Sequence, residues 1–157
     1  MDKITPCLWF NNQAEEAARF YVSIFKNSSI ENINYYVGEG PGPSGTVMTV
    51  IFHLDGQELM ALNGGPEYQF TPAISMMVFC KDQAEVDYYW ERLSEGGEKN
   101  VCGWLTDRYG VSWQVFPTVL GELIGDVDKH KVQNVMRVKL QMTKPIIAEL
   151  QSAYDQA

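Results

Sequence analysis

The sequence contains few of the residues that usually carry strong chemical motifs. Its 157 residues include only three cysteines and two histidines. Cys7, Cys80 and Cys102 are odd in number and scattered, which excludes a disulfide framework and the ligand spacing of a structural zinc site. We expect all three thiols to be reduced and mostly buried.

Positive charge and long apolar runs are also scarce. Twelve lysines and arginines stand against twenty acidic residues, giving a net charge of −8 and a pI of about 4.7. This balance argues against binding to nucleic acid or to an anionic membrane surface. No apolar run approaches the roughly 20 residues that span a bilayer. The first residues, MDKITPC, lack a signal-peptide pattern, so we expect a cytoplasmic protein.

The chain does contain a degenerate internal repeat. The stretch ITPCLWFNNQAEEAARFY returns seventy residues later as ISMMVFCKDQAEVDYYWERL, which indicates one supersecondary unit used twice. Each copy predicts a short apolar strand that leads into a helix, with Asn12 and Asp82 as the N-cap residues. The positions that align include Ile4 with Ile74, Thr5 with Ser75, Trp9 with Phe79, and Gln13-Ala14-Glu15 with Gln83-Ala84-Glu85.

Further strands are predicted after each helix. In the first half they cover residues 30–37, 46–54 and 57–62, and Asp55-Gly56 forms a hairpin turn. The Gly/Pro-rich stretch 38–45 is interpreted as a mobile connection between strands rather than as a loop over a site. The second half is shorter, with a weak strand or loop at 99–105, a turn at 107–110 and a strong strand at 111–116.

The chain after residue 120 has a different character. Asp126 or Asp128 can cap a helix that carries an apolar stripe, and a second amphipathic stretch covers residues 146–154. This extension packs either on its own module or across a subunit interface. We therefore expect one compact α+β structural domain with a first βαβββ module at 1–66, a shortened second βαβββ module at 67–120, and a helical C-terminal extension at 121–157.

The paired modules, the opening ITPCLWFNNQAEEAARFY, the helix VDYYWERLSEGG and the later TDRYGVSW resemble the PhnB-like branch of the vicinal oxygen chelate superfamily. This superfamily includes glyoxalases, extradiol dioxygenases and bleomycin-resistance proteins, and the branch is described as demethylubiquinone methyltransferase-like. The resemblance covers essentially the whole chain. It implies two βαβββ modules whose sheets curve around a shared cleft, in a homodimer.

The resemblance also implies four positions for a catalytic divalent metal. They fall here on Thr5, Met60, Ser75 and Gln114. Hydroxyl, thioether and amide groups are a poor set for such an ion, which prefers imidazole, carboxylate or thiolate. His53 and His130 are interpreted as a half-buried strand residue and a solvated helix residue, too distant in the pattern to replace the site. We therefore predict no metal and no cofactor.

The alternation of strand residues predicts the lining of the cleft once Thr5 and Ser75 are taken to face inward. Glu58 is the weak candidate for a general base or a partner of a cation; alternatively, it is a solvent-facing strand residue. The aromatic and methionine positions either contact a ligand or fill a closed core. The predicted lining is Thr5, Cys7, Trp9, Glu58, Met60, Ser75, Met77, Phe79, Gln114 and Phe116.

Three functions remain open from the sequence. The leading hypothesis is a metal-independent dimer that binds a modest apolar or cationic small molecule in the cleft. The alternative is an enzyme of the same superfamily, either a methyltransferase or a lyase, isomerase or oxygenase with an atypical metal site. The strand-to-helix turns lack the Gly-rich motif of an adenosylmethionine site. The third hypothesis is a structural role with an occluded cleft.

Overall fold

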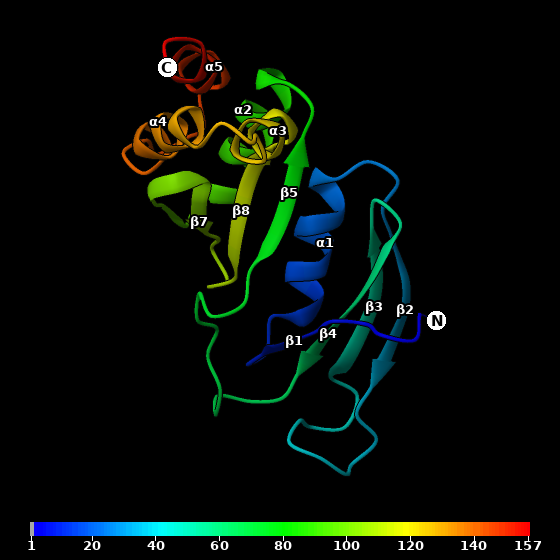
Figure 1. Cartoon of the computed structure of the whole chain (residues 1–157). Helices are drawn as coiled ribbons and strands as arrows, with labels where there is room; N and C mark the ends of the chain where they lie inside the picture. The colour runs from blue at the N-terminus through cyan, green and yellow to red at the C-terminus, as the bar shows by residue number, and fades with distance from the viewer. Residues whose placement is uncertain (1) are drawn as a thin grey trace. The chain divides into compact units, whose positions relative to one another are not determined.

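Each half of the chain folds as a strand, a helix and three further strands (Figure 1). The computed structural model describes residues 2–157, and the chain divides into two units, Met1–Phe70 and Thr71–Ala157. This arrangement confirms the two βαβββ modules that the repeat predicts. The first unit contains β1 (Cys7–Phe10), α1 (Ala14–Ile24), β2 (Ser29–Tyr35), β3 (Val47–Leu54) and β4 (Gln57–Asn63).

The first sheet has the strand order β1-β4-β3-β2, with β1 parallel to β4 and the other neighbours antiparallel. Helix α1 packs on one face because its alanines are small enough to bring it close to the strands. Tyr21 stacks on Phe52 of β3 with ring centroids 6.3 Å apart. The buried residues of α1 are Ala14, Ala17, Ala18, Tyr21 and Ile24. In β3, the buried residues Val50, Phe52 and Leu54 alternate with less buried ones. The side chains of the less buried residues therefore lie on the face of the sheet opposite α1.

The start of α1 differs from the sequence prediction. Asn12 is not its N-cap: Gln13 holds that position without a side-chain bond, and the Ala14 N–H donates to Oδ1 of Asn63, 2.9 Å away. The Asn63 amide also donates to the Val47 carbonyl oxygen at 3.1 Å. A residue from the end of β4 therefore satisfies the helix start, because β4 pairs with the strand that leads into α1.

The second unit repeats this order with shorter strands. Its sheet has the order β5-β8-β7-β6, and β5 is parallel to β8. Asp82 caps α2 as predicted, since its carboxylate accepts the Glu85 N–H at 2.9 Å. The elements are β5 (Met76–Cys80), α2 (Gln83–Ser94), β6 (Glu98–Lys99), the short 3-10 helix η1 (Val101–Gly103), β7 (Trp104–Thr106) and β8 (Ser112–Pro117). The stretch that was predicted as a weak strand or loop thus holds two short strands and a helical turn.

A buried aspartate shapes the turn between β7 and β8. Asp107 is only 3% exposed. Its Oδ1 accepts the backbone N–H groups of Tyr109 at 2.8 Å and Val111 at 3.1 Å, and its Oδ2 accepts the Trp113 indole N–H at 2.8 Å. Gly110 supplies the positive φ, 90°, that the turn requires. The turn predicted from the sequence is confirmed, and the carboxylate explains its shape.

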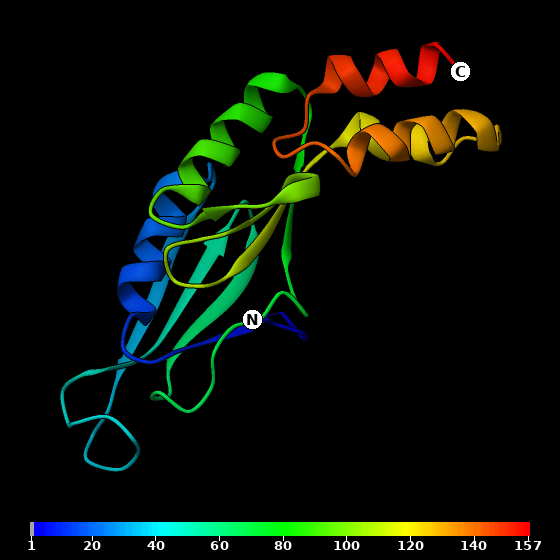
Figure 2. The same cartoon turned by 90° about the vertical axis from the view of Figure 1, so that its left-hand side faces the viewer.

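The C-terminal extension forms three helices, α3 (Thr118–Ile124), α4 (Lys129–Lys139) and α5 (Ile147–Asp155). Asp128 caps α4, as one of the two predicted candidates. The sequence did not predict α3. Figure 2 shows α4 in orange beside α5 in red, and the two helices pack together with α3. Their shared core consists of Leu120, Leu123, Val135 and Leu150.

The extension is tied to its own module. The Gln83 side chain on α2 accepts the Ile147 N–H at 2.8 Å and donates to the Pro145 carbonyl oxygen at 3.0 Å. The Cys102 and Gly103 N–H groups donate to carbonyl oxygens of the segment before α5. The sequence left open whether the extension packs on its own module or across a subunit interface. In the structure, the extension contacts its own module. No helix among residues 2–157 is both long and apolar enough to cross a membrane.

Candidate functional site

Four of the predicted site residues lie on the first sheet, on the face opposite α1, and Thr5 lies just before β1. The parallel pairing of β1 with β4 places Cys7 opposite Met60 and Trp9 opposite Leu62. The Thr5 hydroxyl donates to Glu58 Oε1 at 2.6 Å. The first unit therefore brings together Thr5, Cys7, Trp9, Glu58 and Met60.

The other five predicted residues gather on the second sheet. Met77 pairs with Gln114, and Phe79 pairs with Phe116, whose ring meets it edge-on at a centroid distance of 5.6 Å. The Gln114 amide donates to the Ser75 hydroxyl at 2.9 Å. Each set is thus assembled within its own unit. A single cleft lined by both sets stays a prediction.

The cysteines are free, but one of them is not buried. Cys80 is buried and Cys102 is half-buried, whereas Cys7 is exposed. The prediction that the thiols are mostly buried is wrong for Cys7, because this residue lies on the sheet face that α1 does not cover. Partial desolvation nevertheless raises the pKa of the Cys7 thiol above its ordinary value. The thiol therefore lacks the activation that a nucleophile requires.

Glu58 is more buried than Glu31 and His53, the ionisable residues nearest to it on this face. It is 3% exposed, and its Oε1 accepts hydrogen bonds from the Thr5 hydroxyl and from the Asp2 backbone N–H, the latter at 3.2 Å. The Thr5 hydrogen bond is the largest cause that lowers the pKa of Glu58, with smaller contributions from Asp2 and His53, while desolvation acts in the opposite direction. Glu58 is therefore a positioned carboxylate at neutral pH, better suited to hold a cation than to accept a proton.

His53 belongs to the same site, which the sequence interpretation missed. It pairs with Glu58 across β3 and β4, with 3.8 Å between His53 Nε2 and Glu58 Oε2. Its Nδ1 lies 3.4 Å from Oε2 of Glu31 on β2. The half-buried strand position was predicted correctly, but the position of His53 beside Glu31 and Glu58 was not predicted. The two-residue turn Asp55-Gly56 was the available signal, because it pairs residue 53 with residue 58.

The four superfamily metal positions do not fit a divalent ion in this chain. The Thr5 hydroxyl donates to Glu58, and the Ser75 hydroxyl accepts from the Gln114 amide. Met60 offers a soft thioether, which hard or borderline cations bind poorly. The donors present at these positions thus support the sequence argument against a metal there.

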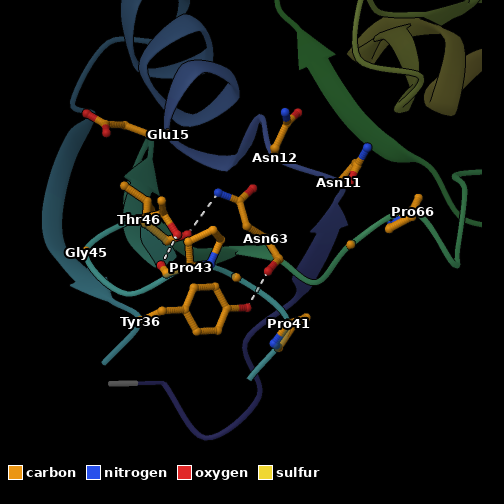
Figure 3. Close-up of a pocket in the computed structure, with 13 residues that line it drawn as sticks. Asn11, Asn12, Glu15, Tyr36, Pro41, Pro43, Gly45, Thr46, Asn63 and Pro66 are labelled. Atoms are coloured by element: carbon orange, nitrogen blue, oxygen red, sulfur yellow. Dashed lines mark hydrogen bonds between the residues drawn. The ribbon is translucent and has the colours of Figure 1, made fainter. Parts of the chain in front are cut away.

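A separate pocket lies beside the Gly/Pro-rich connection between β2 and β3 (Figure 3). Its volume is about 630 Å³. The connection folds around Tyr36, whose N–H donates to Thr46 and whose hydroxyl donates to the Asn63 carbonyl oxygen. Glu15 is the acidic group in the lining, and it forms an ion pair with Arg19 at 2.8 Å. The sequence predicted the connection but not the pocket.

The pH dependence of stability tests the state of Glu58. A carboxylate whose folded-state pKa is lowered stabilises the fold above its unfolded pKa and loses that contribution as the pH falls through the folded value. We expect urea unfolding to show a wild-type advantage over Glu58→Gln that shrinks between about pH 6 and pH 3. The exposed Glu98→Gln is the control. A difference that stays constant over this range would contradict the assignment.

The two modules are similar to known proteins in sequence and in structure. A family profile described as 3-demethylubiquinone-9 3-methyltransferase matches residues 2–116. A PhnB protein from Bacillus cereus, described provisionally as a 3-demethylubiquinone-9 3-methyltransferase, is 39% identical with a TM-score of 0.68, and the match covers 74% of this chain and 99% of that one. Protein PA1353 from Pseudomonas aeruginosa is 24% identical with a TM-score of 0.61, covering 74% and 98%, and supports the fold alone. A search of curated proteins gave no significant match. The helical extension, which begins with α3 at Thr118, lies entirely outside the profile match.

Proposed function

We propose a ligand-binding function for this chain, which belongs to the 3-demethylubiquinone-9 3-methyltransferase family, the PhnB-like branch of the vicinal oxygen chelate superfamily. The protein binds a small organic molecule on the face of the first sheet opposite α1. It does so without a metal at the superfamily positions. The ligand carries a cationic or strongly hydrogen-bonding group next to an apolar body.

The positioned carboxylate of Glu58 is the observation that carries this proposal. Cys7 and Met60 place sulfur-containing side chains opposite each other on the same face. Trp9 is held in place, since its indole N–H donates to the Gly65 carbonyl oxygen at 2.9 Å and its ring meets Tyr68 edge-on at 5.0 Å. A few fixed polar groups within an apolar and aromatic surface are typical of small-molecule sites. Trp9 pairs with Leu62, four residues along β4 from Glu58, so the aromatic ring and the carboxylate lie at different ends of this surface.

The residues do not support methyl transfer from adenosylmethionine. Such a site ordinarily uses a glycine-rich turn between a strand and a helix. The turns that lead into α1 and α2 are Asn11–Gln13 and Lys81-Asp82, and neither contains a glycine. The family description therefore names a reaction for which these turns offer no cofactor site.

A binding experiment with a matched pair of probes tests the proposal. We expect benzylammonium to shift the backbone resonances of β1 and β4 in NMR spectra recorded with a chelator present, and neutral benzyl alcohol to bind more weakly. Glu58→Gln should weaken benzylammonium binding by about tenfold or more, because a hydrogen bond to a charged group contributes about 1.5–3 kcal/mol. Glu98→Gln serves as the control of equal charge change.

Shifts confined to other surfaces, or equal binding of both probes, would overturn the proposed function. Because the chelator removes divalent ions, the result depends on the organic probe alone. We also propose a homodimer, on the family resemblance, and a cytoplasmic location, which the three free cysteines favour.

A further inference from the structure

Three ionisable side chains converge from adjacent strands on the face of the first sheet opposite α1. Glu31 comes from β2, His53 from β3 and Glu58 from β4. One donor atom from each residue can be chosen so that all three lie within 4.8 Å of one another. A register shift between Ile30 and Asn32 interrupts the pairing of β2 with β3 at Glu31. The group is therefore a product of the sheet and is not a run of neighbouring residues.

The separations are too long for direct hydrogen bonds but within reach of a shared ion. The two imidazole-to-carboxylate contacts use different ring nitrogens, 3.4 Å from Nδ1 to Glu31 and 3.8 Å from Nε2 to Glu58. An ion binds only one nitrogen of the ring, and a set of three donor atoms, one from each residue, lies within 4.8 Å of one another. Charge-assisted N–H···O bonds are usually about 2.7–2.9 Å long. Ligand atoms about 2.1 Å from a tetrahedral ion stand about 3.4 Å from each other. Glu31 is 55% exposed in its side chain, so it has the freedom to close the remaining gap.

The charges and the surrounding hydrogen bonds also suit a divalent cation. Two carboxylates and one neutral imidazole balance a charge of +2. The Thr5 hydroxyl and the Asp2 N–H hold Oε1 of Glu58, which leaves Oε2 directed toward His53. Outer hydrogen bonds of this kind orient ligating carboxylates in metal sites. Mixed nitrogen and oxygen donors favour zinc, nickel, manganese or ferrous iron over calcium.

We infer that Glu31, His53 and Glu58 form a binding site for one divalent transition-metal ion, with a different set of ligands from the four positions that the superfamily uses. The three protein ligands leave at least one coordination position for water or for an oxygen-containing ligand. This inference rests on the geometry of the three side chains and does not depend on the organic ligand proposed above. Both occupants use Glu58, so they compete for it.

Calorimetric titration of the chelator-treated, tag-free full chain with Zn²⁺, under reducing conditions near neutral pH, tests the site. We expect one ion per chain. His53→Ala, Glu31→Gln and Glu58→Gln should each weaken binding by about tenfold or more. The loss of a residue that only hydrogen-bonds to a metal ligand already costs about tenfold or more in affinity, so the loss of a ligand should cost at least as much. His130→Ala removes the other histidine of the chain, on α4, and should leave binding unchanged. Affinity should fall as the pH is lowered, because protons compete with the metal for its ligands.

Cobalt substitution identifies the donor atoms independently. The absorption spectrum of the Co²⁺ protein should show nitrogen and oxygen ligands without a thiolate band, which excludes the exposed Cys7 as a ligand. Circular dichroism should confirm that each variant is folded, and His53→Gln replaces any His53→Ala protein that is not. The inference is overturned if Zn²⁺ does not bind, or if binding survives the loss of His53.

Discussion

Replacing Asp107 with alanine should lower the free energy of unfolding by about 3–5 kcal/mol, because it leaves several buried donors without their acceptor. The carboxylate accepts two backbone N–H groups of the turn after β7 and the indole N–H of Trp113. Each unsatisfied buried donor costs about 1–3 kcal/mol, reduced where water can enter. Differential scanning calorimetry should record a fall in Tm of roughly 10 °C for a chain of this length.

Two further variants serve as comparisons for Asp107→Ala. Asp155→Ala removes an exposed carboxylate at the end of α5 and should change stability by less than about 0.5 kcal/mol. Asp107→Asn keeps an acceptor for the turn, so it should lose less stability than Asp107→Ala. A shift of the Trp113 indole N–H resonance in both Asp107 variants would locate the effect. A loss below about 1 kcal/mol in Asp107→Ala would refute the role assigned to this carboxylate.

Replacing Asn63 with alanine should destabilise the first unit by about 2–3 kcal/mol, the sum of a lost helix cap and a lost half-buried hydrogen bond. Its side chain joins the start of α1 to the start of β3 through the Ala14 N–H and the Val47 carbonyl oxygen. Urea unfolding measures the loss. Hydrogen exchange at the Ala14 amide should accelerate in the variant, because that N–H loses its acceptor.

Asn12→Ala is the matched control, since Asn12 is the cap that the sequence predicts and the structure does not use. It should cost less than about 0.5 kcal/mol. The reverse order of effects, with Asn12→Ala the more damaging variant, would mean that the local cap forms in solution and that the contact from Asn63 is not the main one.

Much of the fold follows from patterns within short stretches of the chain. The repeat predicted both modules, and strand alternation predicted β3 and β4 within one residue of their observed ends. Asp82 was identified as a helix cap, and Asp128 as one of two candidates, because a cap bonds to N–H groups two or three residues away. The helix α3 was missed because it is only seven residues long and has no side-chain cap.

The candidate site was only partly predictable. Alternation along β1 and β4 placed Thr5, Cys7 and Glu58 on one face, because successive residues of a strand point to opposite sides. The pairing of His53 with Glu58 could have been found from the tight turn that joins their strands. Glu31 could not, since the position of β2 beside β3 depends on a long connection and on a register shift that no local pattern encodes.

The sequence by itself determined the two modules, their main strands and helices, and the unsuitability of the four superfamily positions for a metal. These depend on periodicity, local capping and donor chemistry, which act within a few residues. Only the tertiary structure decided that Asn63 caps α1, that Cys7 is exposed and that Glu31 joins His53 and Glu58. Such outcomes depend on contacts between residues distant in the chain, whose geometry is set when the strands pair and the helix packs on the sheet.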